Sequence, residues 1–392
     1  MNIGFFTTGF PYKWPFERHP DTKESMSWGG VEEVTYQLAL LLNKKGHKII
    51  IFTTSMDHTQ EVQQYENITV YRYPRSIKVE HTEISISLLF KPLYHDVDVL
   101  HIQRGSPPGA IAGYLYAKIK KKPFVLSYHG EPESKGGMIK KVSMSFFNVF
   151  LPKILKDANV ITALSSEFVN SSKFLSNYKN KIQVIPNGIC TDNFDISSSK
   201  SECRDILGLP ANKNIILFVG SLTEKKAPHV LLKAMKKVIK KIPDSYVIFV
   251  GDGACKKKLK CLSQELGIEM NVNFTGFIAD NNTKMMYYKS ADIFVLPSLL
   301  DAFPMSLLEA SAMGLPLIAS RLESLKAIIE DEYNGLFTIC DDESDLSKKI
   351  IYLLQDERVR LSIGINAKYK ANDFSWEKIA DKVENIYKNI VY

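Results

Sequence analysis

The chain has 392 residues, of which 45% are hydrophobic and 24% are charged. This balance is that of an ordinary globular protein and excludes a disordered, collagen-like or coiled-coil chain, and the length suggests two or three domains. The five cysteines contain no Cys-x-x-Cys pair and the eight histidines no His-x-x-x-His spacing. Neither a disulfide framework nor a zinc site is indicated, and a reducing cytoplasm is the simpler compartment.

Net charge is +7, and its distribution along the chain is uneven. Residues 101–190 hold 13 Lys and Arg against 4 Asp and Glu, whereas residues 191–392 hold 27 of each. Such an excess suits an acidic partner, which could be nucleic acid, a phosphorylated ligand or an anionic lipid; the alternative is a solvated basic face. The first residues are typical of a strand rather than a secretory leader. The uncharged apolar run 142–152 is far shorter than the about 20 residues that span a membrane.

The first half of the chain alternates short β-branched runs with amphipathic stretches. Strands are expected at 2–7, 48–53, 97–102, 124–128, 160–163 and 182–185. Helices are expected at 31–45, at 109–120, around 138–156, and through 175 from Ser165 and Ser166, which can cap a helix. This alternation indicates a parallel sheet covered on both faces.

Residues 190–204 interrupt this alternation and are the best candidate for a linker. The alternation then restarts, with strands expected at 215–219, 246–250, 272–275, 293–296 and 317–319. The predicted fold class is therefore α/β, with two doubly wound, Rossmann-like domains in tandem. Ligands of such sheets bind beyond the carboxyl ends of the strands, so we expect a central cleft between two facing domains.

Three turns in the second half place glycine or lysine directly beyond an expected strand. Lys226 follows Gly220 at the start of a helix, and a helix N-terminus with a lysine beside it suits an anion. Gly251-Asp252-Gly253 is explained equally well by turn chemistry. Thr275-Gly276-Phe277 places an aromatic ring either beside a nucleotide base or in the core.

A fourth turn is the most specific. Asp301 lies in the loop after strand 293–296, and Pro304, a favoured first-turn residue, begins the next helix. Glu309 lies inside this otherwise apolar helix. Because burying an unpaired carboxylate is costly, Glu309 needs a partner, which a pair of sugar or ribose hydroxyls would supply.

Taken in order, these motifs resemble those of retaining glycosyltransferases of the family 4 type, which have the GT-B fold. The resemblance spans essentially the whole chain. Besides the four turns, it is carried by Gly29-Gly30-Val31-Glu32, Gly46-His47-Lys48-Ile49, Tyr128-His129-Gly130, Pro186-Asn187-Gly188-Ile189, Asn334-Gly335-Leu336 and Phe374-Ser375-Trp376. It implies an acceptor-side domain over 1–190, a nucleotide-sugar-binding domain over 191–373, and a C-terminal helix over 374–392 that crosses back to the first domain.

The resemblance also implies the substrates. The donor is a nucleotide-diphosphate sugar, UDP-linked, held mainly by the second domain, and the acceptor is a glycan or a lipid-linked molecule held mainly by the first. No metal and no further cofactor are implied. Retention in this family is described as front-face attack in which the departing diphosphate takes the acceptor proton, so the protein stabilises the leaving group and supplies no nucleophile.

Roles follow residue by residue. By position, Lys226 contacts the donor diphosphate, Glu309 the ribose, and Asp301 the hydroxyls of the donor sugar. His129 matches the family histidine near the transferred sugar, and with Asp301 it forms the expected catalytic pair; an ordinary strand-end histidine is the alternative. The remaining donor-binding residues implied are Gly29, Gly30, Phe277, Phe303, Pro304, Met305 and Ser306. The two glycines let the backbone approach the diphosphate, and the turn from 303 to 306 offers backbone amides.

Some positions depart from the family pattern. Ser221 stands where an arginine is usual, Glu323-Ser324 replaces a glycine pair, Ala327 replaces an acid, and Cys190 replaces an aspartate. These departures keep open a non-catalytic GT-B homologue that acts as a partner subunit. A nucleotide-sugar 2-epimerase is a further alternative, although it lacks the glycine pair at 29–30 and the 186–188 motif.

The basic stretch suggests a membrane partner more than nucleic acid, because the chain has no recognition helix and no aromatics interleaved with its lysines. Lysines flank the apolar run 144–155, as in an interfacial segment. We therefore expect a cytoplasmic protein whose first domain docks on the inner face of the cell membrane, unless this helix merely packs on the sheet and its lysines are solvated.

Overall fold

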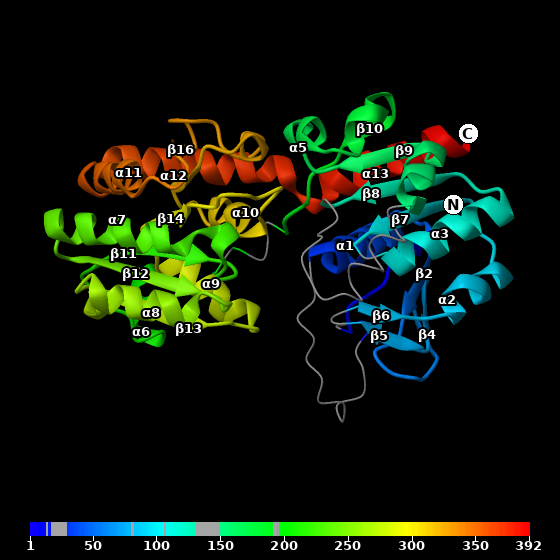
Figure 1. Ribbon diagram of the computed structural model, residues 1–392, viewed down its shortest axis with the longest axis horizontal. Coiled ribbons are helices and arrows are strands. Elements are labelled where there is room, and N and C mark those ends of the chain that lie inside the picture. The colour runs from blue at the N-terminus through cyan, green and yellow to red at the C-terminus, as the bar shows by residue number, and fades with distance from the viewer. Residues whose placement is uncertain are drawn as a thin grey trace. The chain divides into compact units, whose positions relative to one another are not determined.

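The computed structural model describes residues 1–12, 15–16, 30–79, 82–105, 107–130, 149–190, 194 and 196–392. The chain divides into two compact units, of which the N-terminal one comprises Met1–Gly188 and Trp376–Tyr392 and the C-terminal one Ile189–Ser375. Each unit is built on its own sheet of mostly parallel strands with helices packed against it (Figure 1). The α/β class expected from the sequence is therefore confirmed.

The N-terminal unit has an eight-stranded sheet in the order β10-β9-β8-β7-β1-β2-β4-β3. The strands are β1 (Asn2–Phe6), β2 (Lys48–Thr54), β3 (Glu61–Tyr65), β4 (Ile68–Tyr73), β7 (Val99–Arg104), β8 (Phe124–Tyr128), β9 (Val160–Ala163) and β10 (Ile182–Val184). All neighbours pair in parallel except β3 and β4. Every residue of β7 and β8 is buried, as a sheet covered on both faces requires.

Helices of this unit pack in pairs, α1 with α13 and α2 with α3. They are α1 (Gly30–Lys44), α2 (Ser87–Phe90), the 3₁₀ helix η1 (Lys91–Tyr94), α3 (Pro107–Lys120), a helix over 149–157, α5 (Ser166–Ser171), the 3₁₀ helix η2 (Leu175–Lys181) and α13 (Trp376–Val391). A small antiparallel hairpin is formed by β5 (Ile77–Val79) and β6 (Thr82–Ile84). In the described residues, no helix has both the length and the apolar character needed to cross a membrane.

Several local predictions for this unit need correction. The strand expected at 97–102 spans 99–104 instead. The helix expected through 175 ends at Ser171, because the Ser172 hydroxyl accepts the backbone N–H groups of Phe174 and Leu175 and the chain continues as a 3₁₀ turn. Strands β3 to β6 were not anticipated; β3 is an edge strand of mixed polarity whose exposure alternates. Of the helix expected around 138–156, the part before 149 lies outside the described residues.

The C-terminal unit has a six-stranded sheet, all parallel, in the order β13-β12-β11-β14-β15-β16. The strands are β11 (Asn214–Val219), β12 (Ser245–Val250), β13 (Val272–Gly276), β14 (Ile293–Leu296), β15 (Leu317–Ser320) and β16 (Gly335–Thr338). The helices are α6 (Lys200–Ile206), the 3₁₀ helix η4 (Glu224–Lys226), α7 (Pro228–Lys241), α8 (Lys256–Glu265), η5 (Glu269–Asn271), α9 (Asn281–Ser290), α10 (Met305–Ala312), η6 (Glu323–Leu325), α11 (Glu343–Gln355), α12 (Glu357–Ala371) and η7 (Asn372–Phe374). The proposed linker 190–204 is too long, because Ser199 and Glu202 form a capping box that starts α6 at Lys200.

The motifs Pro186-Asn187-Gly188-Ile189 and Phe374-Ser375-Trp376 meet where the chain passes from one unit to the other. The backbone N–H of Ile189 donates to the Phe374 carbonyl at 2.7 Å, and Ile189 and Ser375 form a β-bridge. Gly188 is a packing requirement, since a Cβ there would lie 2.4 Å from the ring of Trp376. The absence of a side chain at Gly188 therefore leaves room for the ring of Trp376, the first residue of α13.

The C-terminal helix α13 belongs to the N-terminal unit, where ion pairs fasten it. Glu384 accepts from Lys45 at 3.2 Å, from His47 at 3.1 Å and from Lys388 at 2.6 Å. Hydrogen bonding to Lys388, with that to His47 and Lys45, lowers the pKa of Glu384 to about 2. The carboxylate thus stays ionised at any physiological pH, and it pairs α13 with Lys45 in the turn that follows α1.

Candidate active site

The glycine turns of the C-terminal unit pack against one another at the carboxyl edge of its sheet. A Cβ on Gly251 would lie 2.0 Å from the carbonyl oxygen of Gly220, and one on Gly253 would lie 2.5 Å from that of Leu222. Gly251 also has φ +142°, a conformation that L side chains rarely adopt. These glycines bring the loops after β11 and β12 into direct backbone contact.

Lys226 and Asp301 are brought together at this edge. The Lys226 ammonium donates to Asp301 Oδ2, and both side chains are largely buried. The Ser298 hydroxyl lies 3.4 Å from the same oxygen, and the Ser324 hydroxyl donates to the backbone carbonyl of Asp301. One correction is needed: Lys226 ends the 3₁₀ turn η4, and α7 begins only at Pro228. The lysine and the aspartate thus form a preassembled pair of opposite charge.

Glu309, on the inner part of α10, already has two partners within the protein. Lys284 Nζ lies 2.8 Å from its Oε1, and the Tyr288 hydroxyl donates to its Oε2 at 2.7 Å. Burial and the neighbouring Glu309 carboxylate raise the pKa of Tyr288 well above its usual value, so the phenol remains a donor. Neither partner was expected from the sequence. Their i, i+4 spacing on α9 was a weak signal, and only the fold brings that face to α10.

The turn into α10 presents backbone more than side chains. Phe303 is buried, with its ring centroid 5.8 Å from that of Phe374, so its side chain belongs to the core. Pro304 is the N-cap, and Met305 and Ser306, half-buried, open the helix without a side-chain cap. Phe277, by contrast, lies beyond β13 with 65% of its surface exposed. Of the two interpretations of Phe277, the one that placed it in the core is wrong.

His129 lies just beyond β8 in the N-terminal unit and is fixed by residues of the neighbouring strand. Its Nε2 is 2.6 Å from Gln103 Oε1 at the end of β7. The next residue, Arg104, lies over the ring of Tyr128 at 4.2 Å and donates to the carbonyl of Gly130. Burial, together with the positive charge of Arg104, lowers the pKa of His129 to about 4. The imidazole is therefore neutral at physiological pH, and the supporting pair at 103 and 104 was missed from the sequence.

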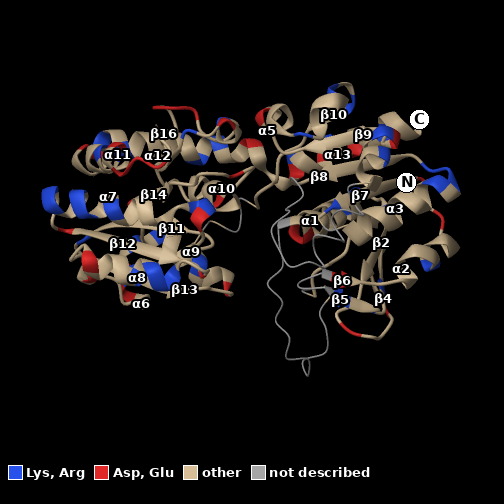
Figure 2. Cartoon of the chain, in the orientation of Figure 1, with Lys and Arg blue, Asp and Glu red and all other residues tan. Residues whose placement is uncertain are grey.

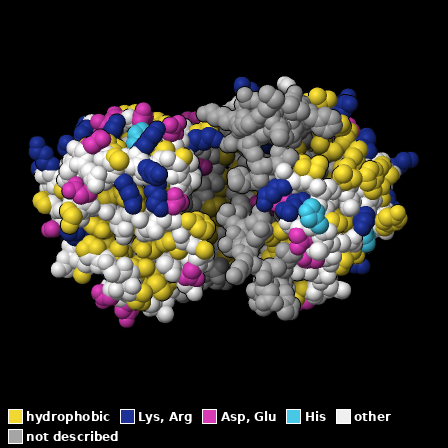
Figure 3. Space-filling view, turned by 60° about the horizontal axis from the view of Figure 1, so that its bottom comes forward, with side chains coloured by type: hydrophobic (Ala, Val, Ile, Leu, Met, Phe, Trp, Pro, Cys, Tyr) yellow, Lys and Arg dark blue, Asp and Glu magenta, His cyan; other side chains and the backbone are white. Residues whose placement is uncertain are grey.

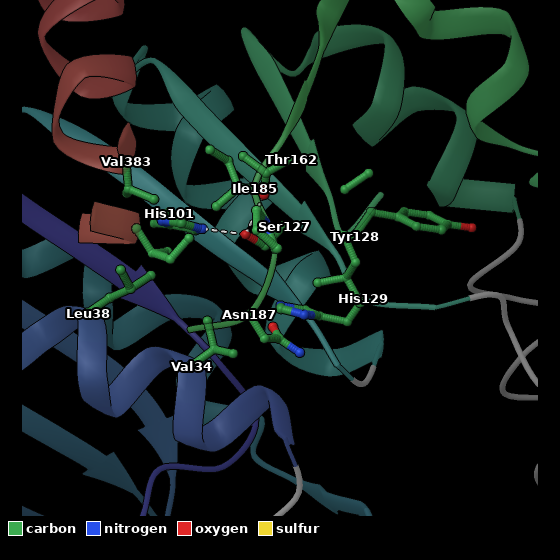
Figure 4. A pocket seen from close by; sticks show the side chains of 14 residues that line it. Val34, Leu38, His101, Ser127, Tyr128, His129, Thr162, Ile185, Asn187 and Val383 are labelled. Carbon is green, nitrogen blue, oxygen red and sulfur yellow. Dashed lines mark hydrogen bonds between the residues drawn. The ribbon is translucent and has the colours of Figure 1, made fainter. Parts of the chain in front are cut away.

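A small pocket adjoins His129 (Figure 4). His129 and Asn187 lie toward one end of its lining, while His101 and Ser127, joined by a 2.6 Å hydrogen bond, lie toward the other. Ser127 continues to Thr162 at 2.7 Å, and His101 bonds the Tyr387 hydroxyl of α13. Burial lowers the pKa of His101 to about 3, so this network is also uncharged. It links the strands beneath His129 to the C-terminal helix.

Some sequence predictions gain no contacts from the structure. Gly29 lies outside the described residues, and Gly30 is placed only as the first residue of α1. Ser221 is exposed beyond β11, and Glu323 is exposed and paired with Lys326 at 2.7 Å. Within the described ranges, no three His, Cys, Asp or Glu side chains gather in a way that could hold a metal ion.

Two family models match consecutive parts of the chain. The model of glycosyl transferases group 1 matches residues 199–370, and that of glycosyltransferase family 4 matches residues 28–193. Among solved structures, sucrose-phosphate synthase from Thermosynechococcus elongatus is similar with a TM-score of 0.75 and 22% identity, covering 99% of this chain and 98% of that one. HepE of Anabaena, solved with UDP, has a TM-score of 0.75 and 18% identity, covering 99% and 100%. These likenesses confirm the GT-B fold.

Relatives that are similar over most of the chain are also named for glycosyl transfer or for the synthesis of a glycolipid. An uncharacterized glycosyltransferase of Methanocaldococcus jannaschii is 29% identical over 92% of this chain and 94% of its own length. An α-monoglucosyldiacylglycerol synthase of Streptococcus pneumoniae is 29% identical over 90% and 78%. A UDP-Gal:α-D-GlcNAc-diphosphoundecaprenol α-1,3-galactosyltransferase of Escherichia coli is 27% identical over 82% and 83%. The chain therefore belongs to the group 1 glycosyl transferases of the family 4 type, and it is a glycosyltransferase with the GT-B fold.

Proposed function

We propose that this glycosyltransferase retains the anomeric configuration, takes its sugar from a UDP-linked donor on the C-terminal unit, and delivers it to a glycan or lipid-linked acceptor on the N-terminal unit. The observation that carries the proposal is the Lys226–Asp301 pair at the carboxyl edge of the C-terminal sheet. The printed names of relatives support the substrates. One relative uses UDP-Gal and a diphosphoundecaprenol acceptor, and another is named for a glucosyldiacylglycerol product.

Lys226 is the cation for the donor diphosphate. When the donor binds, the Lys226 ammonium donates hydrogen bonds to phosphate oxygens as well as to Asp301. The Asp301 carboxylate stays beside it and accepts hydrogen bonds from hydroxyls of the donor sugar. As the glycosidic bond breaks, negative charge grows on the phosphate oxygen and the ammonium stabilises it. The backbone N–H groups at the start of α10 offer further donors to the same anion.

The two acids of the C-terminal unit are poorly suited to nucleophilic catalysis. Asp301 is held by Lys226 and Ser298, and Glu309 by Lys284 and Tyr288. Charge-assisted hydrogen bonds of this kind stabilise a carboxylate and weaken it as a nucleophile. This arrangement supports front-face attack, in which the acceptor oxygen bonds to C1, the C1–O bond to the diphosphate breaks, and the departing diphosphate takes the acceptor proton.

The N-terminal unit contributes a neutral His129. Because its Nε2 is engaged with Gln103, its Nδ1 remains for a sugar hydroxyl. Metal ions are not needed in this scheme, because Lys226 and backbone amides do what Mg²⁺ does in other transferases. EDTA should leave the rate unchanged, and strong inhibition would contradict the metal-free scheme. Nucleic acid has no part in it.

A panel of nucleotide sugars, screened by thermal unfolding, tests the donor. A true donor at 100 to 1,000 times its Kd should stabilise the protein by about 3–4 kcal/mol. NMR of the product with the identified donor then reads the anomer, and an inverted anomer would overturn retention. If UDP-linked sugars give no shift while a GDP- or ADP-linked sugar does, the base assignment is wrong.

A non-catalytic partner subunit is the second candidate, because Ser221 leaves only one side-chain cation of the expected pair. This candidate predicts donor binding without hydrolysis or transfer by the isolated chain. A nucleotide-sugar 2-epimerase would instead convert the donor sugar without any acceptor. UDP release that requires the acceptor identifies the transferase, and NMR of the nucleotide sugar after incubation without acceptor separates the epimerase, which changes the sugar, from the non-catalytic subunit, which does not.

A further inference from the structure

Helix α3 is unusual for an outer helix of an α/β unit, because its outward side is apolar. Its sequence, PPGAIAGYLYAKIK, has no charged residue before Lys118. A helix at a protein surface normally has one apolar face, which packs on the core, and one polar face. A helix that is apolar all round is normally buried. Here Ile119 is 60% exposed.

The neighbouring helices extend this apolar surface. Ile86, Phe90 and Tyr94, spaced four residues apart along α2 and η1, are 55%, 61% and 87% exposed. These elements pack on α3, where the Tyr116 hydroxyl donates to the carbonyl of His95 at 2.7 Å. On the other side of α3, Lys118 and Tyr114 bond Asp157 of the helix over 149–157, each at 2.9 Å. The exposed apolar residues of this surface, which we call the α2–α3 face, are Ile86, Phe90, Tyr94, Ile119 and Val149.

The same elements, or the residues directly after them, carry seven lysines. They are Lys91, Lys118, Lys120, Lys121, Lys122, Lys153 and Lys156. Asp157 and Asp96 engage Lys118 and Lys122, whereas Lys120 and Lys121 have no acidic partner in the described part of the chain. Figure 2 shows lysine or arginine at the end of α3, and Figure 3 shows apolar side chains with basic ones among them toward the edge where Figure 1 places α2 and α3.

We propose that the α2–α3 face docks on an anionic lipid bilayer, inserting Phe90, Tyr94 and Ile119 at the headgroup level while the lysines contact lipid phosphates. Exposed apolar side chains with lysines on the same elements are complementary to such a surface. A second copy of the chain is a poor occupant, because two lysine-rich faces would repel each other. The proposal rests on the proposed function in one respect, since docking serves to bring a lipid-linked acceptor to the enzyme.

Docking is measured with the full chain and vesicles, without any sugar donor. Vesicles of equal parts phosphatidylglycerol and phosphatidylcholine should sediment the protein in 50 mM salt and release most of it in 500 mM salt. Pure phosphatidylcholine should bind little. No sedimentation with the anionic vesicles at low salt overturns the proposal, as does equal binding to both kinds of vesicle.

Two double variants locate the surface. Lys120→Glu with Lys156→Glu should lower partitioning at least about 30-fold, the effect of losing two lysines near an anionic surface. Phe90→Ser with Tyr94→Ser should lower it about tenfold and weaken the binding that survives high salt. Thermal unfolding and donor binding of both variants should match the parent, which shows that they fold.

Matched controls come from the C-terminal unit. Lys257→Glu with Lys258→Glu makes the same charge change on exposed residues of α8, and Leu361→Ser with Ile365→Ser removes side chains that are 57% and 69% exposed on α12. Neither control should lower partitioning more than twofold. If the control and test variants lose the same amount of partitioning, the α2–α3 face is not the docking surface. The proposal is also overturned if the parent is a dimer that the Phe90 and Tyr94 variant converts to monomer.

Failure here is distinguishable from failure of the proposed function. If vesicles do not bind but sugar reaches a soluble acceptor, the docking face is wrong and the transferase proposal stands. If vesicles bind but no nucleotide sugar is consumed, the docking face stands and the catalytic proposal falls.

Discussion

The two units place polar side chains beyond the strands of similar parallel sheets, but in opposite electrostatic states. In the C-terminal unit these side chains are charged and paired, Lys226 with Asp301 and Lys284 with Glu309. In the N-terminal unit the two histidines are neutral, with His129 on Gln103 and His101 between Ser127 and Tyr387, although the guanidinium of Arg104 lies nearby. The same architecture thus carries an ionic edge in one half and, in the other, an edge whose histidines are uncharged, which we call the neutral edge.

The difference matches the two substrates that the proposed reaction brings together. A diphosphate carries charge, and paired side chains that exchange partners can receive it without leaving an ion unpaired. A hydroxyl acceptor is uncharged, and neutral hydrogen-bonding groups orient it without raising the cost of desolvation. Substitutions that move one edge toward the character of the other test this division.

The largest effect should come from removing the cation of the ionic edge. Lys226→Ala should lower kcat by about 10²–10³, because a preorganised charge on the leaving group is lost. Lys226→Arg should recover part of this loss. Steady-state kinetics with the identified donor measures both, with Lys257→Ala as the matched surface control. Turnover of the alanine variant within threefold of the parent would remove Lys226 from the site.

The acids of the same edge should separate binding from chemistry. Glu309→Ala should raise the donor KM about 10–100-fold with little change in kcat, since a ribose contact persists in the ground and transition states alike. Asp301→Ala should lower kcat as well, because it also removes the partner that orients Lys226. An unchanged donor affinity in the Glu309 variant would refute its assignment to the ribose.

The neutral edge should become the weak point of the protein as the pH falls. The pKa of His101 is about 3 in the folded protein, below the usual value near 6.5, so between pH 6.5 and 3 only the unfolded chain takes up this proton. The contribution of the neutral His101 to the free energy of unfolding is fully present above pH 6.5. Below pH 6.5 it is lost at about 1.4 kcal/mol per pH unit.

Urea unfolding at pH 7, 6 and 5 measures this slope. His101→Gln should reduce this slope, whatever its effect on stability at pH 7, and part of the slope should remain because the pKa of His129 is also lowered, to about 4. Equal slopes in the parent and the variant would show that His101 is not held neutral by burial.

Local sequence predicted much of this molecule. Alternating runs gave β8 and β9 at their observed bounds, because buried parallel strands are continuous β-branched and aromatic segments. The edge hairpin of β3 and β4 was missed, since β3 is half-exposed and rich in glutamine, which carries little strand signal. Ser172 ended α5 early through a side-chain bond that periodicity cannot foresee.

The sequence predicted which residues form the candidate site better than it predicted their contacts with one another. Position in the motifs pointed to Lys226, Asp301, Glu309 and His129, but pairing across distant parts of the chain is a tertiary property. Asp301 is 75 residues from Lys226, and Glu309 is 25 residues from Lys284. The ribose suggested for Glu309 stays a prediction, and what the sequence did not indicate is that Lys284 and Tyr288 also pair with this carboxylate within the protein.

The smallest expected effect comes from adding charge where the ionic edge lacks it. Ser221 is exposed directly beyond β11, at the position where the family has an arginine, and the neighbouring turn already presents Lys226. Ser221→Arg should lower the donor Kd about three- to tenfold, because a guanidinium adds charge-assisted bonds to the diphosphate but loses side-chain freedom. Calorimetry with UDP measures the change, and Ser221→Gln, similar in reach and uncharged, is the control. Equal affinities of the arginine and glutamine variants would show that the diphosphate does not approach residue 221, and an unchanged sugar preference would confirm that the added charge acts on the diphosphate alone.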